Sequence, residues 1–325
     1  MNINLCKTVI TNGGNLVPLL VPSGDSRGMG LMNPSILNDN DNLLVNIRNV
    51  NYILYHSEGD QKFINRWGPL AYLNPENDIK LKTFNFIGTF NDDLSIKDAN
   101  KVDTTLLDSP TPLWEFHGLE DARLVKWDDK LYMIGVRRDT TPNGQGRMEL
   151  SEIDSTFKEI SRVRIEPPTP GSYCEKNWVP ILDMPYHMVK WTNPTEVVKL
   201  HPETGTSETV FLGTQVIPNV PDFRGGSQVV PWGNYRLAIV HQVNLYKNKL
   251  GQKDAIYEHR FVVWDKDWTI VHLSEAFSFM TAQIEFCCGL TFYKGDMLIT
   301  FGFQDNAAYL LRVPENNINT LVYGK

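Results

Sequence analysis

The sequence has few of the features that mark metal-binding, secreted or membrane-spanning proteins. Its 325 residues include only four cysteines, Cys6, Cys174, Cys287 and Cys288, and their spacings do not match those of a zinc site. No apolar run approaches the roughly 20 residues of a membrane-spanning helix. The first residues lack a basic region followed by a long apolar core, so we predict no signal peptide. We therefore expect reduced, packing cysteines in a cytoplasmic protein.

Positive charge and helical periodicity are also scarce. The formal net charge is −7, which gives no basic field for nucleic acid or for an anionic membrane. Few windows show a sustained 3.6-residue apolar period, whereas alternating, β-branched and aromatic runs are frequent. The 19 prolines and 23 glycines are scattered rather than gathered in one linker. We predict a single all-β domain over residues 1–325.

A hairpin pattern recurs five times along the chain. In each copy, two strand-like runs flank a short polar turn. The copies are residues 34–48, 122–137, 178–190, 227–241 and 290–305. The 325 residues divide into about 65 per copy, somewhat above the roughly 40–50 of common propeller repeats, and loops and outer strands can hold the surplus. We predict a five-bladed β-propeller, in which equivalent strand ends surround one central channel.

Charged and polar residues stand at the predicted strand ends. The five second strands end at Arg48, Arg137, Lys190, His241 and Asp305. The segment HGLEDARLV at 117–125 also places Glu120, Asp121 and Arg123 at the start of a strand. Charges crowded there can shift one another's pKa and point into a cavity. The alternatives are five unrelated surface charges and a salt bridge at a strand end.

These motifs resemble those of glycoside hydrolase family 130, the β-mannoside phosphorylases and their relatives, which are five-bladed propellers. GLEDAR at 118–123 resembles the family's Gly-x-Glu-Asp-Pro-Arg motif, with Ala122 in place of proline. Further matches are the Asn33 and Arg48 pair, Lys176-Asn177, Arg224-Gly225-Gly226, VHQV at 240–243 and FGFQD at 301–305. Departures at Ala122, Gln242 and 301–303 indicate a divergent member and keep the related propeller-type mannosyltransferases in consideration.

The resemblance implies that Asp121 is the general acid of an inverting glycosyl transfer, acting through a hydroxyl of the bound sugar. A phosphorylase uses phosphate as its nucleophile, so it needs cations rather than a second carboxylate. The implied phosphate ligands are Arg147, Lys176 and His241, with Arg137, Arg138 and Arg162 as additions. The substrate-binding candidates are Asn33, Arg48, Glu120, Arg123, Trp114, His117, Lys190 and Asp305. Structural alternatives are a solvated loop charge for Arg147, a core histidine for His241 and a turn cap for Asp305.

We therefore expect a β-mannoside phosphorylase or mannosyltransferase that uses no cofactor and no metal. Its expected substrates are oligosaccharides with inorganic phosphate or a sugar phosphate. No nucleic-acid partner is expected, and weakly protected blade edges are compatible with a homo-oligomer. The alternatives are a nucleotide-sugar-dependent glycosyltransferase and a non-catalytic glycan-binding propeller. A hydrolase would need a second carboxylate, for which Glu175 and Glu285 are the candidates.

Overall fold

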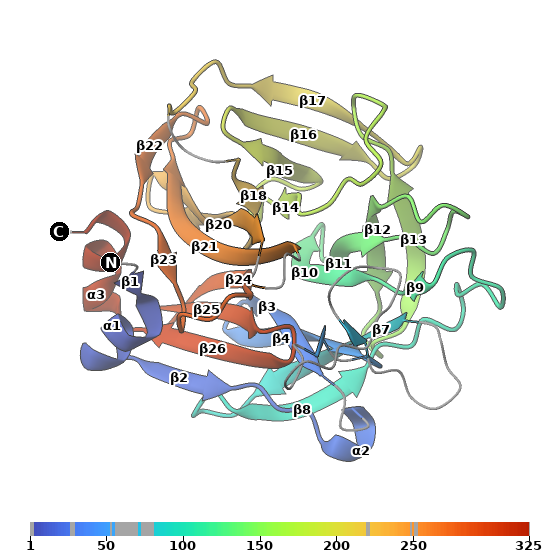
Figure 1. The fold of residues 1–325 in the computed structure, drawn as a ribbon, viewed down its shortest axis with the longest axis horizontal. Helices are drawn as coiled ribbons and strands as arrows, with labels where there is room; N and C mark the ends of the chain where they lie inside the picture. Colours follow the sequence, from blue (N-terminus) through green and yellow to red (C-terminus); the bar gives the residue numbers. More distant parts are fainter. Residues whose placement is uncertain are drawn as a thin grey trace.

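A computed structural model describes residues 3–26, 30–52, 54–55, 71–72, 81–218, 222–247, 249 and 253–324. Its sheets stand around a common centre (Figure 1). The all-β class and a propeller-like arrangement, both predicted from the sequence, are confirmed.

Four of the sheets contain a row of four antiparallel strands, each hydrogen-bonded to the next. The first has β3 (Leu31–Asp39), β4 (Asn42–Val50), β7 (Leu81–Phe90) and β8 (Ile96–Lys101), with β9 (Phe116–His117) beside β7. The second has β10 (Glu120–Trp127), β11 (Lys130–Arg137), β12 (Arg147–Ile153) and β13 (Glu159–Ile165). The third has β14 (Val179–Pro180), β15 (His187–Thr192), β16 (Thr195–His201) and β17 (Thr206–Leu212). The last has β24 (Glu285–Tyr293), β25 (Asp296–Phe303), β26 (Ala307–Val313) and β2 (Asn15–Pro18), so a strand near the N-terminus completes the last sheet.

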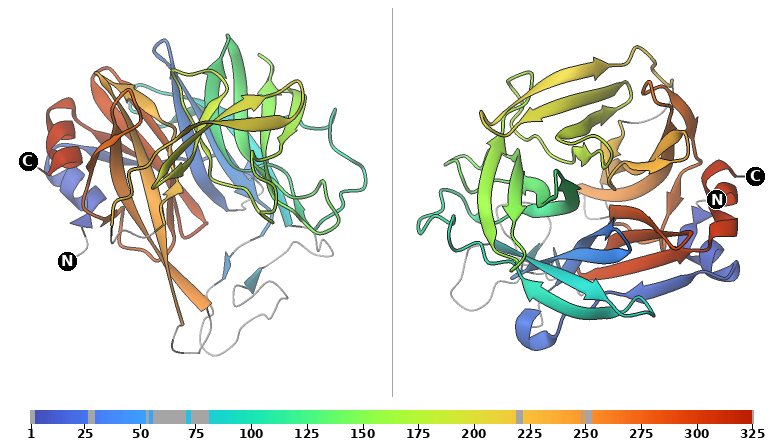
Figure 2. Two further views of the ribbon diagram at one scale, coloured as in Figure 1. Left: turned by 90° about the horizontal axis from the view of Figure 1, so that it is seen from above. Right: turned by 180° about the vertical axis from the view of Figure 1, so that it is seen from behind.

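A seven-stranded sheet lies between the third and the last of these sheets and is less regular. Its long strands β20 (Tyr235–Lys247) and β21 (Lys253–Trp264) project beyond the neighbouring sheets (Figure 2). The short strands are β18 (Arg224–Gly225), β19 (Val230–Trp232), β22 (Ile270–Leu273), β23 (Phe277–Ser278) and β1 (Ile3–Asn4). Strand β1 runs parallel to β23, so the N-terminal segment joins two different sheets. Strands β5 (Leu54–Tyr55) and β6 (Ala71–Tyr72) form a separate pair.

All five predicted hairpins are confirmed, with shifted bounds. They are β3–β4, β10–β11, β14–β15, β19–β20 and β24–β25. In the second hairpin the turn residues Asp128 and Asp129 have φ of 49° and 61°. Two successive positive φ angles give a turn whose twist matches the right-handed twist of the strands. Aspartate tolerates this conformation because its short side chain bonds locally to the backbone.

Alternate residues of the central strands face two different hydrophobic layers. In β20, Leu237 and Ile239 pack toward the last sheet, whereas Ala238 and Val240 pack toward the third. This follows from the two-residue period of a strand. Each pair of neighbouring sheets encloses such a layer, including the last sheet and the first. The central strands therefore have apolar residues on both faces, and the polar residues at their ends lie at the axis.

Three helices were not predicted from the sequence, namely α1 (Leu5–Thr11), α2 (Ser23–Ser26) and α3 (Glu315–Tyr323). Helices of four to nine residues are too short for a 3.6-residue period to emerge. α1 and α3 lie side by side near the two termini (Figure 1) and bury Leu5, Val9, Ile318 and Val322 in one layer. Over the described ranges, no helix is both long and apolar enough to cross a membrane. The four cysteines are free thiols.

Candidate active site

The strand ends at the axis surround a polar cavity of about 320 Å³. Three of the five predicted strand-end residues line it, namely Arg48, His241 and Asp305. The rest of the lining consists of Met32, Asn33, Tyr52, Phe116, Glu120, Asp121, Lys176, Asn177, Arg224, Tyr257, Ile284 and Phe286. Polar groups thus lie beside the apolar surfaces of two phenylalanines, which is a lining typical of a small-molecule site.

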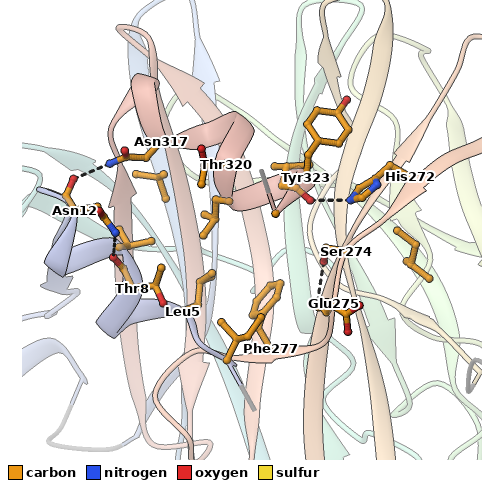
Figure 3. Close-up of a pocket in the computed structure, with 17 residues that line it drawn as sticks. Leu5, Thr8, Asn12, His272, Ser274, Glu275, Phe277, Asn317, Thr320 and Tyr323 are labelled. Atoms are coloured by element: carbon orange, nitrogen blue, oxygen red, sulfur yellow. Dashed lines mark hydrogen bonds between the residues drawn. The ribbon is translucent and has the colours of Figure 1, made fainter. Parts of the chain in front are cut away.

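Three other hollows are larger, and the two described next differ from the axial cavity in character. A groove of about 460 Å³ lies between α1, α3, β22 and β23 (Figure 3). It is mostly apolar, and its His272 bonds through Nε2 to the carbonyl of Val322 at 2.9 Å. A hollow of about 770 Å³ is lined by residues 82–85 and by residues from the segment 101–113, with Arg137, Arg162 and Glu159 in ion pairs. Since the ionic groups named there are already paired, the axial cavity is the candidate site.

Asp121 occupies the centre of a charged cluster in the axial cavity. Its Oδ1 accepts hydrogen bonds from Asn33 Nδ2 at 2.7 Å and from Arg48 Nη1 at 2.8 Å. The other terminal nitrogen of Arg48 lies 3.4 Å from Glu120 Oε2 and donates to the Tyr52 hydroxyl at 2.8 Å. Arg48 is 5% exposed, so one buried cation holds two carboxylates that adjoin in the sequence. The acidic pair and Arg48 therefore come together as the sequence predicts.

The backbone presents these polar side chains in an uncommon conformation. Asn33, Asp121, Asn177 and Asp305 have φ of 46°, 52°, 61° and 48°. Positive φ costs non-glycine residues conformational energy, and such residues cluster at functional sites. At Asn33 and Asp121 it accompanies register shifts between residues 32 and 35 and between residues 120 and 123, where a bulge redirects the side chain.

Close packing behind Asn33 gives a test of this arrangement. A Cβ at Gly302 would lie 2.1 Å from Asn33 Oδ1 and 2.7 Å from its backbone nitrogen. We expect Gly302→Ala to displace Asn33 from Asp121 and to lower the free energy of unfolding by about 1–3 kcal/mol. Urea unfolding measures the change. Gly24→Ala is the control, because a Cβ at Gly24 meets nothing within 4 Å. Equal stability of the two variants would contradict the close approach.

The three carboxyl groups of the cavity titrate differently. Burial opposes ionisation of Asp121, but Arg48 and Asn33 outweigh it and lower its pKa. Burial raises the pKa of Glu120, and Arg48 offsets this only in part. Burial, with the neighbouring charge of Asp121, raises the pKa of Asp305 to about 6. The cavity thus holds one firmly ionised carboxylate and two carboxyl groups that protonate more readily.

His241 is neutral in this environment. Burial, with the charges of His259 and Arg123, lowers its pKa well below the ordinary value. Its Nδ1 lies 3.0 Å from the carbonyl oxygen of Gly225, and a carbonyl only accepts, so Nδ1 carries the proton. The ring stacks on Tyr257 at a centroid distance of 5.6 Å. Nε2 therefore carries a lone pair, and His241 gains positive charge only if an anion arrives beside it.

Two cations line the cavity without a fixed partner. Lys176 and Arg224 are exposed, and neither side chain forms an ion pair or hydrogen bond within the described part of the chain. The positive charge of Lys176 contributes to the pKa values of Asp121, Glu120 and Asp305, so its ammonium lies near them. Both cations are available to an anionic ligand.

Several predicted site residues lie outside the cavity. Arg147 pairs with Glu166 at 2.7 Å and donates to two backbone carbonyls, and Lys190 pairs with Glu196 at 3.1 Å. Trp114 packs on Gly144, where a Cβ would lie 2.3 Å from its ring. His117 lines the hollow beside residues 82–85.

Arg123 and Arg137 are buried and do not line the axial cavity. Arg123 donates to the carbonyl oxygens of Asp121 at 2.7 Å and of Gly226 at 2.9 Å, so it fixes the backbone beneath Asp121. Arg137 pairs with Glu149 and Asp139. Both residues have structural partners in the described chain.

Sequence reasoning did not select several residues of the cavity as site residues. Asn177 and Arg224 belong to two of the motifs that resemble those of the family, Lys176-Asn177 and Arg224-Gly225-Gly226. Membership of these motifs is the sequence signal that could have identified them. Tyr257 comes from β21, where nothing in the sequence distinguishes it from the other aromatic residues of predicted strands. Of the two candidate hydrolytic bases, Glu285 accepts three backbone N–H groups and Glu175 accepts from Trp178 Nε1 at 3.0 Å. Neither lines the cavity.

No protein-family model matches this sequence, and no curated protein sequence matches it. Solved structures do match over most of the chain. The β-1,2-mannobiose phosphorylase of Listeria innocua shares 10% identity at a TM-score of 0.55, covering 91% of this chain and 93% of the other. The mannose phosphorylase MPT-4 of Leishmania mexicana, in complex with phosphate ion, shares 11% at 0.55 and covers 96% and 92%.

A third structure comes from work on the GH130 family of mannoside phosphorylases, which contains hydrolases that target β-1,2 mannosidic linkages in Candida mannan. It shares 12% identity at a TM-score of 0.56, covering 89% of this chain and 85% of the other. Identities this low establish likeness of fold and not of activity. The structural neighbours thus confirm the resemblance to glycoside hydrolase family 130 as one of fold, at low sequence identity.

Proposed function

We propose that this chain is a divergent, five-bladed carbohydrate-active enzyme that transfers a mannosyl unit between a β-linked acceptor and phosphate, with inversion. The seven-stranded sheet is the fifth blade in this proposal, because hydrophobic layers cover both of its faces. The observation that carries the function is one cavity that combines Asp121 with the uncommitted cations Lys176 and Arg224. Such a cavity suits a sugar and a phosphate side by side.

The reaction divides between the two ends of the cavity. Asp121 passes a proton to the oxygen of the bond between the mannosyl unit and its acceptor, through a hydroxyl of the sugar. As that bond breaks, an oxygen of hydrogen phosphate bonds to the anomeric carbon from the opposite face. The products are mannose 1-phosphate and the free acceptor, and the proton of hydrogen phosphate replaces the one delivered. Asn33, Arg48 and Glu120 hold the sugar and Asp121 in place.

Lys176, Arg224 and His241 hold the phosphate in this proposal. Arginine pairs with phosphate through two parallel N–H groups, and lysine supplies a point charge. His241 accepts at Nε2 in the free enzyme and donates there once protonated beside the phosphate. Arg147 would join them only by leaving Glu166, so its phosphate role stays a prediction. The roles of Trp114, His117 and Lys190 toward the acceptor also stay predictions.

The test incubates the purified chain with mannose 1-phosphate, and in parallel with GDP-mannose, and a panel of mannosyl and glucosyl acceptors. Phosphate release with a new disaccharide is the expected result. Lys176→Met and Arg224→Met should each raise the KM for mannose 1-phosphate about 10–100-fold, because each variant loses a charge-assisted hydrogen bond to the phosphate. Lys130→Met is the matched control, since Lys130 pairs with Glu152 on the surface.

The other outcomes separate the rival functions. Release of GDP without phosphate would identify a nucleotide-sugar-dependent glycosyltransferase, which needs the same two cations for a diphosphate. Release of neither, with retained binding of a mannoside, would identify a glycan-binding module. If neither Lys176→Met nor Arg224→Met changed the turnover, the proposed phosphate site would be wrong.

A further inference from the structure

Three carboxyl groups share the axial cavity, but only one of them accepts hydrogen bonds from the described residues. Asp121 Oδ1 receives two hydrogen bonds, from Asn33 and from Arg48. Glu120 lies 3.4 Å from Arg48. Arg48 also donates to the hydroxyls of Tyr52 and Thr83. Asp305 lines the same cavity and accepts no side-chain or backbone hydrogen bond from the described residues.

This distribution conflicts with the use of Asp121 as an acid in the free enzyme. Both of its neighbours donate, and an arginine is always charged, so they favour the ionised carboxylate. An acid must hold a proton when the substrate arrives. The proton that Asp121 delivers therefore has to reside elsewhere in the cavity before the sugar binds.

Asp305 is held in the cavity by the backbone rather than by side-chain partners. It follows β25 in a tight turn with Gln304, and their φ angles are 48° and 52°. Gln304 fixes the turn to Ile284, donating from its backbone nitrogen at 2.7 Å and accepting at Oε1 at 3.0 Å. Two successive positive φ angles usually call for glycine, asparagine or aspartate, and Gln304 departs from that preference. The turn thus maintains a strained conformation that keeps an unpartnered carboxyl in the cavity.

We propose that Asp305 stores the catalytic proton of this cavity and passes it to Asp121 once the sugar is bound. This inference rests on the proposed function and deepens it. In the step, the O–H bond of the Asp305 carboxyl breaks and an O–H bond forms on Asp121, which then protonates the leaving oxygen. The proton of hydrogen phosphate returns to the carboxyl pair when the new C–O bond forms. No oxidant, metal or further reactant enters the balance.

The charges around Asp305 support this role. Asp121 and Glu120 on β10 favour its protonated form, whereas Arg48 on β4 and Lys176 ahead of β14 oppose it. Tyr257 on β21 and Cys288 on β24 also face it, and burial with nearby negative charge keeps both protonated at neutral pH. Burial, with Asp121, raises the pKa of Asp305 to about 6, so this carboxyl holds a proton in mildly acidic solution while Asp121 does not.

The experiment compares Asp305→Asn with the wild-type chain across pH, on two mannosides in the presence of phosphate. One is a β-mannobiose, whose leaving group needs a proton, and the other is 2,4-dinitrophenyl β-mannoside, whose leaving group does not. Wild-type turnover of mannobiose should fall above about pH 6. In Asp305→Asn it should drop by about 10²-fold at pH 7 and recover partly at lower pH. Turnover of the dinitrophenyl mannoside should change by less than about 3-fold.

Two further variants keep the proposal open to refutation. Asn306→Ala alters the same turn at an exposed residue and should leave both rates unchanged. If Glu120→Gln rather than Asp305→Asn abolishes the fall above pH 6, Glu120 is the proton store and the proposal is wrong. An equal loss on both mannosides, with an unchanged pH profile, would show that Asp305 only binds sugar. A wild-type chain that turns over neither mannoside would instead remove the proposed function itself.

Discussion

Replacing Asp121 with asparagine is expected to lower turnover about 10³-fold while the fold and much of the sugar binding remain. Asparagine has nearly the same shape, and its Oδ1 can still accept from Asn33 and Arg48. It cannot carry a proton to the leaving oxygen, so the loss falls on the chemical step. The measurements are phosphate release from mannose 1-phosphate with an acceptor, and acceptor affinity by calorimetry.

The stability of the same variant reports whether Asp121 is ionised in the folded chain. Its folded pKa is lowered, so its carboxylate stabilises the fold above the unfolded value near 3.8 and loses this contribution as the pH falls further. Asp121→Asn lacks the contribution. Its free energy of unfolding should therefore decrease less than that of the wild type as the pH falls below about 4.

A matched control distinguishes this site from carboxylates in general. Asp39 pairs with Lys126 outside the axial cavity, at 2.8 Å. Asp39→Asn should leave turnover unchanged. If Asp121→Asn kept turnover within about 3-fold of the wild type, its role in proton transfer would be excluded, because a general acid contributes 10²–10⁴-fold.

Much of the fold was predictable because each hairpin carries its own local signal. The turn residues Asp128 and Asp129 lie between two apolar runs, and no other part of the chain is needed to recognise that hairpin. The strand ends then follow from the repeat, which predicts that Arg48, His241 and Asp305 lie at one centre, and these three residues line the axial cavity. The helices α1 and α3 were not predictable from the sequence, because their stability comes from the hydrophobic layer on which they pack.

The ionic partners of the candidate site were less predictable. Arg147 and Lys190 stand at strand ends like Arg48, yet each pairs with a glutamate on a neighbouring strand or loop, Glu166 and Glu196. Strand register decides which charge meets a partner, and sequence spacing does not give register between sheets. Arg224 is the converse case. It lacks a partner in the described chain, and this absence, which only coordinates show, makes it a candidate ligand for phosphate.

Replacing Arg48 with methionine is expected to lower the free energy of unfolding by about 3–5 kcal/mol at neutral pH. Methionine is similar in length but leaves Asp121 and Glu120 without their buried cation, and it removes donors to Tyr52 and Thr83. Lys130→Met breaks an exposed pair with Glu152 at 3.1 Å and should cost less than about 1 kcal/mol. Urea unfolding of both variants at several pH values measures the difference.

The pH dependence decides whether the loss is electrostatic. Without Arg48, the pKa of Asp121 and of Glu120 rises above the unfolded value, so the cost exists where the unfolded chain is ionised, above about pH 4, and shrinks below it. Adding Glu120→Gln and Asp121→Asn to Arg48→Met should recover most of the lost stability, because no buried charge then lacks a partner. A cost that is independent of pH and persists in the triple variant would mean that Arg48 acts by packing. The charge of Arg48 would then contribute nothing to the stability of the carboxylate cluster.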